Sequence, residues 1–165
     1  MLELSNYKLE DLILTALKSE IEARDFYKGV AEKINNFLLK DRILFLSSEE
    51  EKHRLVFEKI FKEKFPGKEI VLPEKSPVPL PELKIEQEKV PLSEVFWVAM
   101  QAEKSAHDFY VSLSNLFPPE SLERKMLLYI ASMEMGHYQL LQNERENALK
   151  FEDYDIVFSM THMGP

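Results

Sequence analysis

The chain has 165 residues, a hydrophobic content of 45% and a net charge of -8. This length and apolar content suffice for one globular domain with its own core, so we expect a single domain over residues 1–165. The negative charge would repel a phosphate backbone, which makes nucleic acid an unexpected partner. Because the sequence contains no cysteine, it excludes disulfides, zinc–thiolate sites, iron–sulfur clusters and thiol nucleophiles.

The composition favours an all-α protein, since glycines are few and Glu and Lys are abundant. The N-terminal stretch MLELSNYKLEDLIL carries acidic residues where a signal peptide needs a basic region. No apolar run approaches the roughly 18 residues of a membrane span. We therefore expect a cytoplasmic protein that does not associate with a membrane.

Apolar residues recur at helical spacing in separate blocks along the chain. These blocks predict helices at about 8–33, 37–64, 92–116 and 119–147. The connections within the first pair and within the second pair are short, so each pair should form an antiparallel hairpin.

The segment 65–91 joins the two predicted hairpins. Its prolines at positions 66, 73, 77, 79, 81 and 91 exclude a continuing helix. Apolar residues such as Leu80 and Leu83 favour an ordered crossover along the bundle over a disordered linker. The C-terminal tail 148–165 also carries apolar residues, Phe151 among them, and we expect it to pack on the bundle or on another subunit.

The two halves of the chain resemble each other. ALKSEIEARDFY (16–27) aligns with AMQAEKSAHDFY (99–110), and LSSEEEKH (46–53) aligns with IASMEMGH (130–137). Two hairpins that carry the same polar pattern predict a bundle with pseudo-twofold symmetry.

Every predicted helix places one glutamate in the middle of its apolar stripe. An unpaired buried carboxylate costs several kcal/mol even after relaxation, so four converging carboxylates require positive charge between them. Arg24 and His107 each lie one turn from a glutamate, but they cannot neutralise four carboxylates. Bound metal cations can.

The second and fourth helices each carry Glu-x-x-His, a spacing that puts the carboxylate and the imidazole on one face. Glutamates from two helices, with Glu-x-x-His from the other two, form the ligand set of di-iron and di-manganese bundles. The predicted ligands are Glu20, Glu50, His53, Glu103, Glu134 and His137.

With these motifs the chain resembles the rubrerythrin family of the ferritin-like superfamily. SEIEARDFY and EEEKH are similar to the first two helices of that family, and the resemblance covers nearly all of residues 8–147. Two Glu-x-x-His motifs, each preceded about 30 residues earlier by Glu-x-x-Ala-x-x-x-Tyr, are far more specific than one. The resemblance implies a ferritin-like four-helix bundle, two antiparallel hairpins joined by a long crossover, and a homodimer.

Two features depart from the family pattern. The chain lacks the cysteine-ligated rubredoxin-like module, so electrons would come from a separate donor, either a rubredoxin-like protein or a flavoprotein. Family members also commonly carry an extra glutamate one turn after the third-helix ligand, where this chain has Ala106. The site is therefore expected to be closer to a symmetric ferritin or bacterioferritin-like centre.

Some residues near the predicted ligands need a separate interpretation. Tyr27 and Tyr110 lie on the ligand faces, and the resemblance favours hydrogen bonds to ligand carboxylates over a purely structural core position. Glu49 and Glu144 are expected to be exposed. His107 is expected to be half-buried, and the sequence assigns no partner to His162 or role to the C-terminal tail.

Carboxylate and imidazole ligands suit two iron ions, with manganese or zinc as alternatives. Two ions that share carboxylates can each take up one electron. Together they can deliver the two electrons that are needed to split an O–O bond. The leading hypothesis is a non-haem diiron oxidoreductase, a rubrerythrin-like peroxidase or oxidase that reduces hydrogen peroxide or dioxygen and protects against oxidative stress. The alternatives are a ferritin-type ferroxidase and a metal-free helical interaction module.

Overall fold

The computed structural model of the protein describes residues 3–81, 83 and 90–161, with side chains described as far as residue 152. Within these residues the regular structure is entirely helical, which confirms the all-α prediction. The helices are α1 (Leu9–Lys33), α2 (Phe37–Lys64), α3 (Leu92–Ser114) and α4 (Leu122–Thr161). None of them, over the residues described, combines the length and the apolar content needed to cross a membrane.

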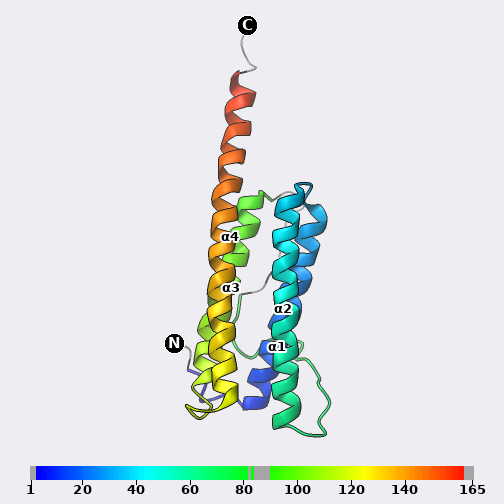
Figure 1. Ribbon diagram of the computed structural model, residues 1–165, viewed down its shortest axis with the longest axis vertical. Helices are drawn as coiled ribbons and strands as arrows, with labels where there is room; N and C mark the ends of the chain where they lie inside the picture. Colours follow the sequence, from blue (N-terminus) through cyan, green and yellow to red (C-terminus); the bar gives the residue numbers. More distant parts are fainter. Residues whose placement is uncertain (1–2, 82, 84–89, 162–165) are drawn as a thin grey trace.

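The helices form a four-helix bundle built from two hairpins, as predicted. Helix α1 packs along α2, and α3 packs along α4, while the hairpins meet through α1 with α3 and α2 with α4. The helices run side by side along the long axis of the molecule, and the colours in Figure 1 show that the chain reverses direction within each hairpin. This is the architecture of a ferritin-like bundle.

Side-chain caps fix where two of the helices begin. The Asn36 side chain accepts a hydrogen bond from the backbone N–H of Leu39 at 3.1 Å, so α2 starts at Phe37. The Ser121 hydroxyl accepts one from the N–H of Arg124 at 3.2 Å. Helix α4 therefore starts at Leu122, a few residues later than the predicted start at 119.

The predicted end of the fourth helix at 147 is wrong. Helix α4 continues to Thr161, because no proline or glycine interrupts residues 148–161. The continuation projects beyond the other helices (Figure 1). Phe151, in the tail that was expected to pack on the bundle or on another subunit, does not pack on the bundle and is 74% exposed. Ala148, at the start of the tail, is buried in the cluster that contains Ile43. The side chains of residues 153–161, and His162, lie outside the described residues.

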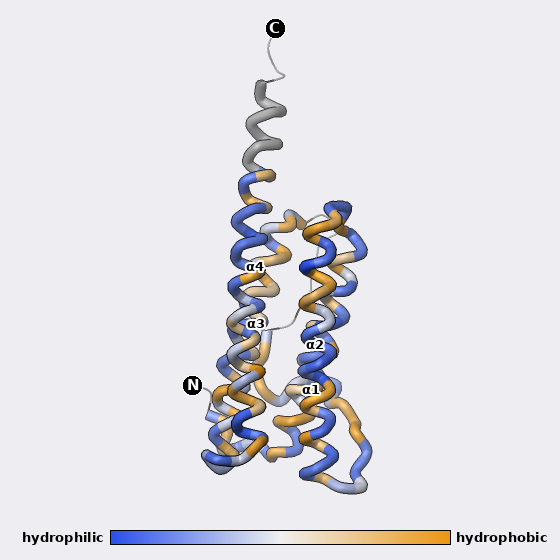
Figure 2. Tube along the Cα trace, viewed as in Figure 1, coloured by the Kyte–Doolittle hydropathy of each residue, from blue (hydrophilic) through white to orange (hydrophobic). Residues whose placement is uncertain are grey.

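The apolar core is divided into two clusters along the bundle. One cluster contains Leu12, Phe57 and Phe109, and the other contains Ile43 and Leu141. Apolar and polar residues recur along the coloured parts of the helices in Figure 2, so each helix presents an apolar face to this core. The predicted ligands lie on the same helix faces, between the two clusters.

The crossover is held against the side of the bundle in its described part, as predicted. Val78 is 1% exposed, and Leu80 packs against the cluster that contains Leu12. The ammonium group of Lys18 donates to the backbone carbonyls of Pro73 at 2.8 Å and Glu74 at 2.5 Å. These contacts fix the crossover relative to α1.

Candidate metal centre

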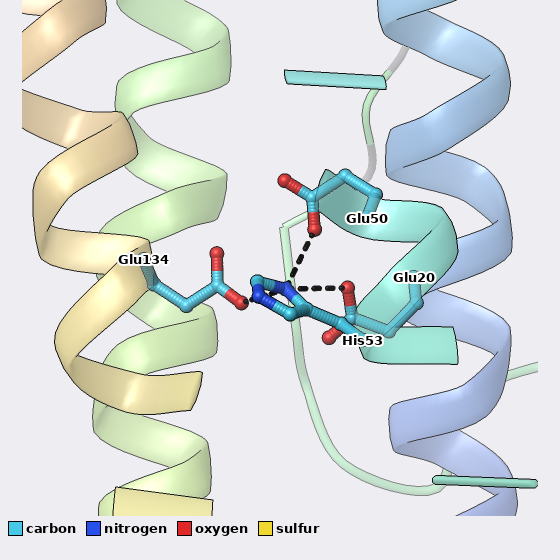
Figure 3. A group of neighbouring side chains, drawn as sticks. All are labelled: Glu20, Glu50, His53 and Glu134. Atoms are coloured by element: carbon cyan, nitrogen blue, oxygen red, sulfur yellow. Dashed lines mark hydrogen bonds and ion pairs between the residues drawn. The ribbon is translucent and has the colours of Figure 1, made fainter. Parts of the chain in front are cut away.

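The six predicted ligands converge at the centre of the bundle. Each is at most 4% exposed. They form two groups whose ligand atoms lie within 4.8 Å of one another. One group is Glu20, Glu50, His53 and Glu134, drawn in Figure 3, and the other is Glu50, Glu103, Glu134 and His137.

Glu50 and Glu134 belong to both groups, and each points one oxygen at each histidine. Glu50 Oε2 lies 3.2 Å from His53 Nδ1, and its Oε1 lies 3.0 Å from His137 Nδ1. Glu134 Oε1 lies 3.0 Å from His53 Nδ1, and its Oε2 lies 3.3 Å from His137 Nδ1. Both carboxylates therefore have the placement that bridges between two ions would need.

Glu20 and Glu103 each approach only one histidine. Glu20 Oε2 lies 3.6 Å from His53 Nδ1, and Glu103 Oε2 lies 3.5 Å from His137 Nδ1. The two imidazole rings stack, with their centroids 5.6 Å apart. The pseudo-twofold symmetry predicted from the repeat is thus present in the geometry of the cluster.

Two buried tyrosines connect the halves of the cluster. The Tyr27 hydroxyl on α1 donates to Glu103 Oε1 on α3, and the Tyr110 hydroxyl on α3 donates to Glu20 Oε1 on α1. Each tyrosine thus holds the far oxygen of a carboxylate whose other oxygen faces a histidine. The hydrogen bonds expected of Tyr27 and Tyr110 are present, and both cross between the hairpins.

Burial raises the pKa of Glu20 and the pKa of Glu103 well above the ordinary value for a glutamate. The neighbouring carboxylates raise both pKa values further. Burial also acts to raise the pKa of Glu50 and Glu134, but their contacts with both histidines outweigh it and the pKa of each is lowered.

The same contacts act on the imidazoles. Although burial alone would lower the pKa of His137, its contacts with Glu103, Glu134 and Glu50 raise that pKa to about 12. The pKa of His53 is raised in the same way. Without metal, protons on the histidines and on Glu20 and Glu103 therefore neutralise the cluster.

The donor atoms fit a pair of divalent cations. Glu50 Oε1, Glu134 Oε1 and His137 Nδ1 are buried and have no hydrogen-bond partner among the described residues. Glu50 Oε1 and His137 Nδ1 are close but not aligned for a hydrogen bond. Buried polar atoms without a hydrogen-bond partner destabilise the folded state unless a bound ion or water contacts them. Oxygen and nitrogen donors aimed at common points suit iron, manganese or zinc.

Two glutamates expected at the surface are buried instead. Glu49 is 5% exposed and forms an ion pair with Lys52, and Glu144 is 8% exposed and pairs with Arg42 of α2. Both predictions were wrong because each acid lies beside a cation that compensates its burial. Neither belongs to the groups that hold the predicted ligands.

His107 is half-buried, as expected, and its Nδ1 lies 2.9 Å from Asp108 Oδ1. It contributes no atom to the two groups of candidate ligands. The nearness of His107 to Glu103 along the helix therefore does not bring it into the cluster.

The chain matches the Rubrerythrin family over residues 11–145. It belongs to the rubrerythrin family. A solved structure of a hypothetical protein from Pyrococcus furiosus has the same fold, with 35% sequence identity and a TM-score of 0.75, over 90% of this chain and 95% of that one. No curated protein matches the chain. The resemblance drawn from the Glu-x-x-His motifs is therefore confirmed.

Proposed function

We propose that this member of the rubrerythrin family is a non-haem diiron oxidoreductase that reduces hydrogen peroxide, or dioxygen, in protection against oxidative stress. The observation that carries the proposal is the pair of ligand groups that share Glu50 and Glu134. When bound, two ferrous ions would supply one electron each, which with two protons convert one hydrogen peroxide molecule into two water molecules.

The side chains would divide the work of holding the ions. Glu50 and Glu134 would join the two positions, and each histidine would complete one of them. Glu20 would serve the His53 position, because its Oε2 faces that ring, and Glu103 would serve the His137 position. Tyr27 and Tyr110 would fix the orientation of these terminal carboxylates through their hydrogen bonds.

The electrons for further turnovers would come from a separate protein. The chain has no cysteine and so no cysteine-ligated electron-transfer centre of its own. The proposed donor is a rubredoxin-like protein or a flavoprotein. The proposal also includes a homodimer in the cytoplasm, in keeping with the family resemblance.

A ferroxidase is the second candidate function, with ferrous iron as the substrate. The observation that favours it is the alanine at position 106, which leaves the two halves of the site equivalent, as in ferritin-type centres. Storage of oxidised iron would need a hollow assembly of many subunits. Size-exclusion chromatography with light scattering separates the candidates, because a dimer has no cavity for a mineral core.

A metal-free interaction module is the less favoured candidate, because it leaves Glu50 Oε1 and Glu134 Oε1 buried without a hydrogen-bond partner among the described residues. It predicts that Glu50→Ala stabilises the protein.

Stopped-flow mixing of the reduced, iron-loaded protein with hydrogen peroxide tests the proposal. We expect absorbance changes of iron oxidation that are much faster than for free ferrous iron under the same conditions. A matched control is the Glu51→Ala variant, which removes a neighbouring carboxylate that faces Arg24 and Arg54 instead of the cluster. Oxidation no faster than that of free iron would contradict the proposal.

A further inference from the structure

A small cavity adjoins the candidate metal centre. Its volume is about 20 Å³, and all four glutamates of the cluster line it, whereas neither histidine does. Its remaining walls come from α1, α3 and the crossover, and α2 and α4 contribute only Glu50 and Glu134. The cavity therefore approaches the carboxylates from between α1 and α3.

The cavity is polar at its inner end. Glu50 and Glu134 are each 1% exposed, and the Oε1 atom of each lacks a hydrogen-bond partner in the described structure. An apolar void of this size would stay dry, but a polar one of at least about 10–15 Å³ holds a water-sized molecule. The space is thus suited to one small polar ligand beside the carboxylates.

Two alanines keep this space open. Ala23 follows Glu20 by one turn on α1, and Ala106 follows Glu103 by one turn on α3, and both line the cavity. Their methyl groups leave room that a longer side chain at either position would occupy.

Leu80 of the crossover forms part of the outer wall. Its backbone N–H donates to the carbonyl of Val78 at 2.8 Å, and Val78 is 1% exposed. The Ser76 hydroxyl donates to the same carbonyl at 2.6 Å. Since the buried Val78 anchors this turn, Leu80 is a fixed wall that limits the width of the cavity.

We propose that the oxidant reaches the metal centre between α1 and α3, and that Ala23, Ala106 and Leu80 select it by size. The cavity admits hydrogen peroxide or dioxygen and excludes alkyl hydroperoxides such as tert-butyl hydroperoxide. This inference rests on the proposed function, because it takes the centre to be loaded with iron.

Azide serves as a probe of access that does not depend on turnover. The Ala106→Leu variant is loaded with iron, oxidised and titrated with azide, with binding read from visible absorption. We expect iron content equal to that of the unmodified protein and an azide Kd raised about tenfold or more, because the leucine fills the cavity. Ala23→Leu should raise the azide Kd by a similar factor. If Ala106→Leu fails to fold, Ala23→Leu provides the test of the access route.

Ser132→Leu is the matched control. Ser132 is exposed on α4, two residues before Glu134, and it does not line the cavity. Its azide Kd should equal that of the unmodified protein. Unchanged azide affinity in a folded, iron-loaded alanine variant would overturn the proposed route.

Leu80→Ala tests the route in the opposite direction. We expect the ratio of the oxidation rate with tert-butyl hydroperoxide to that with hydrogen peroxide to rise about tenfold or more, because the wall recedes. Equal rates with both peroxides in the unmodified protein would overturn the size limit.

The two proposals fail in different ways. If azide follows the expected pattern but peroxide oxidises the protein no faster than free iron, the proposed function fails and the access route stands. If Ala106→Leu reacts with peroxide at the unmodified rate, the function stands and the route fails.

Discussion

The two halves of the molecule, α1 with α2 and α3 with α4, are alike at the bundle centre and unlike around it. At the centre each half supplies one glutamate, one Glu-x-x-His and one tyrosine. The corresponding contacts are matched, with the Glu20 to His53 distance of 3.6 Å opposite the Glu103 to His137 distance of 3.5 Å. The two ligand groups consequently offer equivalent positions.

The layer around the centre differs between the halves. Arg24 lies 2.7 Å from Glu51 in the first half. The aligned residues of the second half are His107 and Met135, and His107 contacts Asp108 instead. The symmetry thus extends from the candidate ligands to Tyr27 and Tyr110 and to Ala23 and Ala106, while the charged residues farther out differ. The predictions below test this difference, from the largest expected effect to the smallest.

Removal of a shared carboxylate should have the largest effect, and the effect should be equal in both halves. Glu50→Ala and Glu134→Ala each take a ligand from both positions, so we expect bound iron to fall well below that of the unmodified protein. The melting temperature of the protein in excess metal should fall by roughly 5–10 °C, because metal binding stabilises the folded state. Metal analysis and calorimetry measure the two effects. A clear difference in bound iron or melting temperature between the two variants would contradict the equivalence of the two halves.

Metal binding should displace protons, and its affinity should rise with pH. The raised pKa values of the histidines, Glu20 and Glu103 mean that the folded metal-free protein holds more protons than the unfolded chain. The contribution of the two carboxyl groups is complete only below their unfolded pKa, about 4.3, and that of the histidines only below about 6.5. The stabilisation is lost as pH rises toward about 12, the pKa of His137.

Calorimetric titration with metal in buffers of different ionisation enthalpy counts the released protons. We expect about four, one from each histidine and one each from Glu20 and Glu103. The melting temperature of the metal-free protein should fall from pH 6.5 upward, and that of the loaded protein should change less. Metal binding without proton release would contradict the electrostatic account of the cluster.

Loss of one tyrosine hydroxyl should have a moderate effect of the same size in both halves. Tyr27→Phe frees Glu103 and Tyr110→Phe frees Glu20, so each should weaken metal affinity or activity about 10–100-fold. Metal-competition titrations with a chelator give the affinities. Folding stability without metal serves as the control, and a loss seen there alone would assign the tyrosines to packing.

The smallest expected effect is on the free energy of unfolding, and it should differ between the two halves. Arg24→Ala removes the contacts with Glu51 and Asp25, and His107→Ala removes only the contact with Asp108. Because these side chains are partly exposed, we expect Arg24→Ala to cost at most about 1 kcal/mol in the free energy of unfolding, and His107→Ala less. Urea denaturation measures both, and iron content should be unchanged in either variant.

The bundle and its cluster were predictable because both depend on local periodicity. A glutamate in register with Leu46 and Phe57, as Glu50 is, marks a buried charge that needs compensation. The equivalent placement of Glu134 in the second half then identified the pair. The six ligands could be predicted without knowing which helices are neighbours.

The features that were not predicted depend on contacts between distant segments. Hydrogen bonds from Tyr27 and Tyr110 to carboxylates were expected, but which carboxylate each one contacts is set by the packing of α1 against α3. The burial of Glu144 depends on Arg42, about 100 residues earlier in the chain. The cavity beside Ala106 exists because the crossover lies over that face, and residue spacing alone gives no measure of its width.

Anaerobic titration of the metal-free protein with ferrous iron tests most directly whether the bundle holds two ions between its halves. We expect saturation at two ions per chain, a count set by the two ligand groups. Glu20→Ala and Glu103→Ala should each lower the count by the same amount. Saturation at a single ion, or no binding that depends on Glu50 and Glu134, would contradict the account.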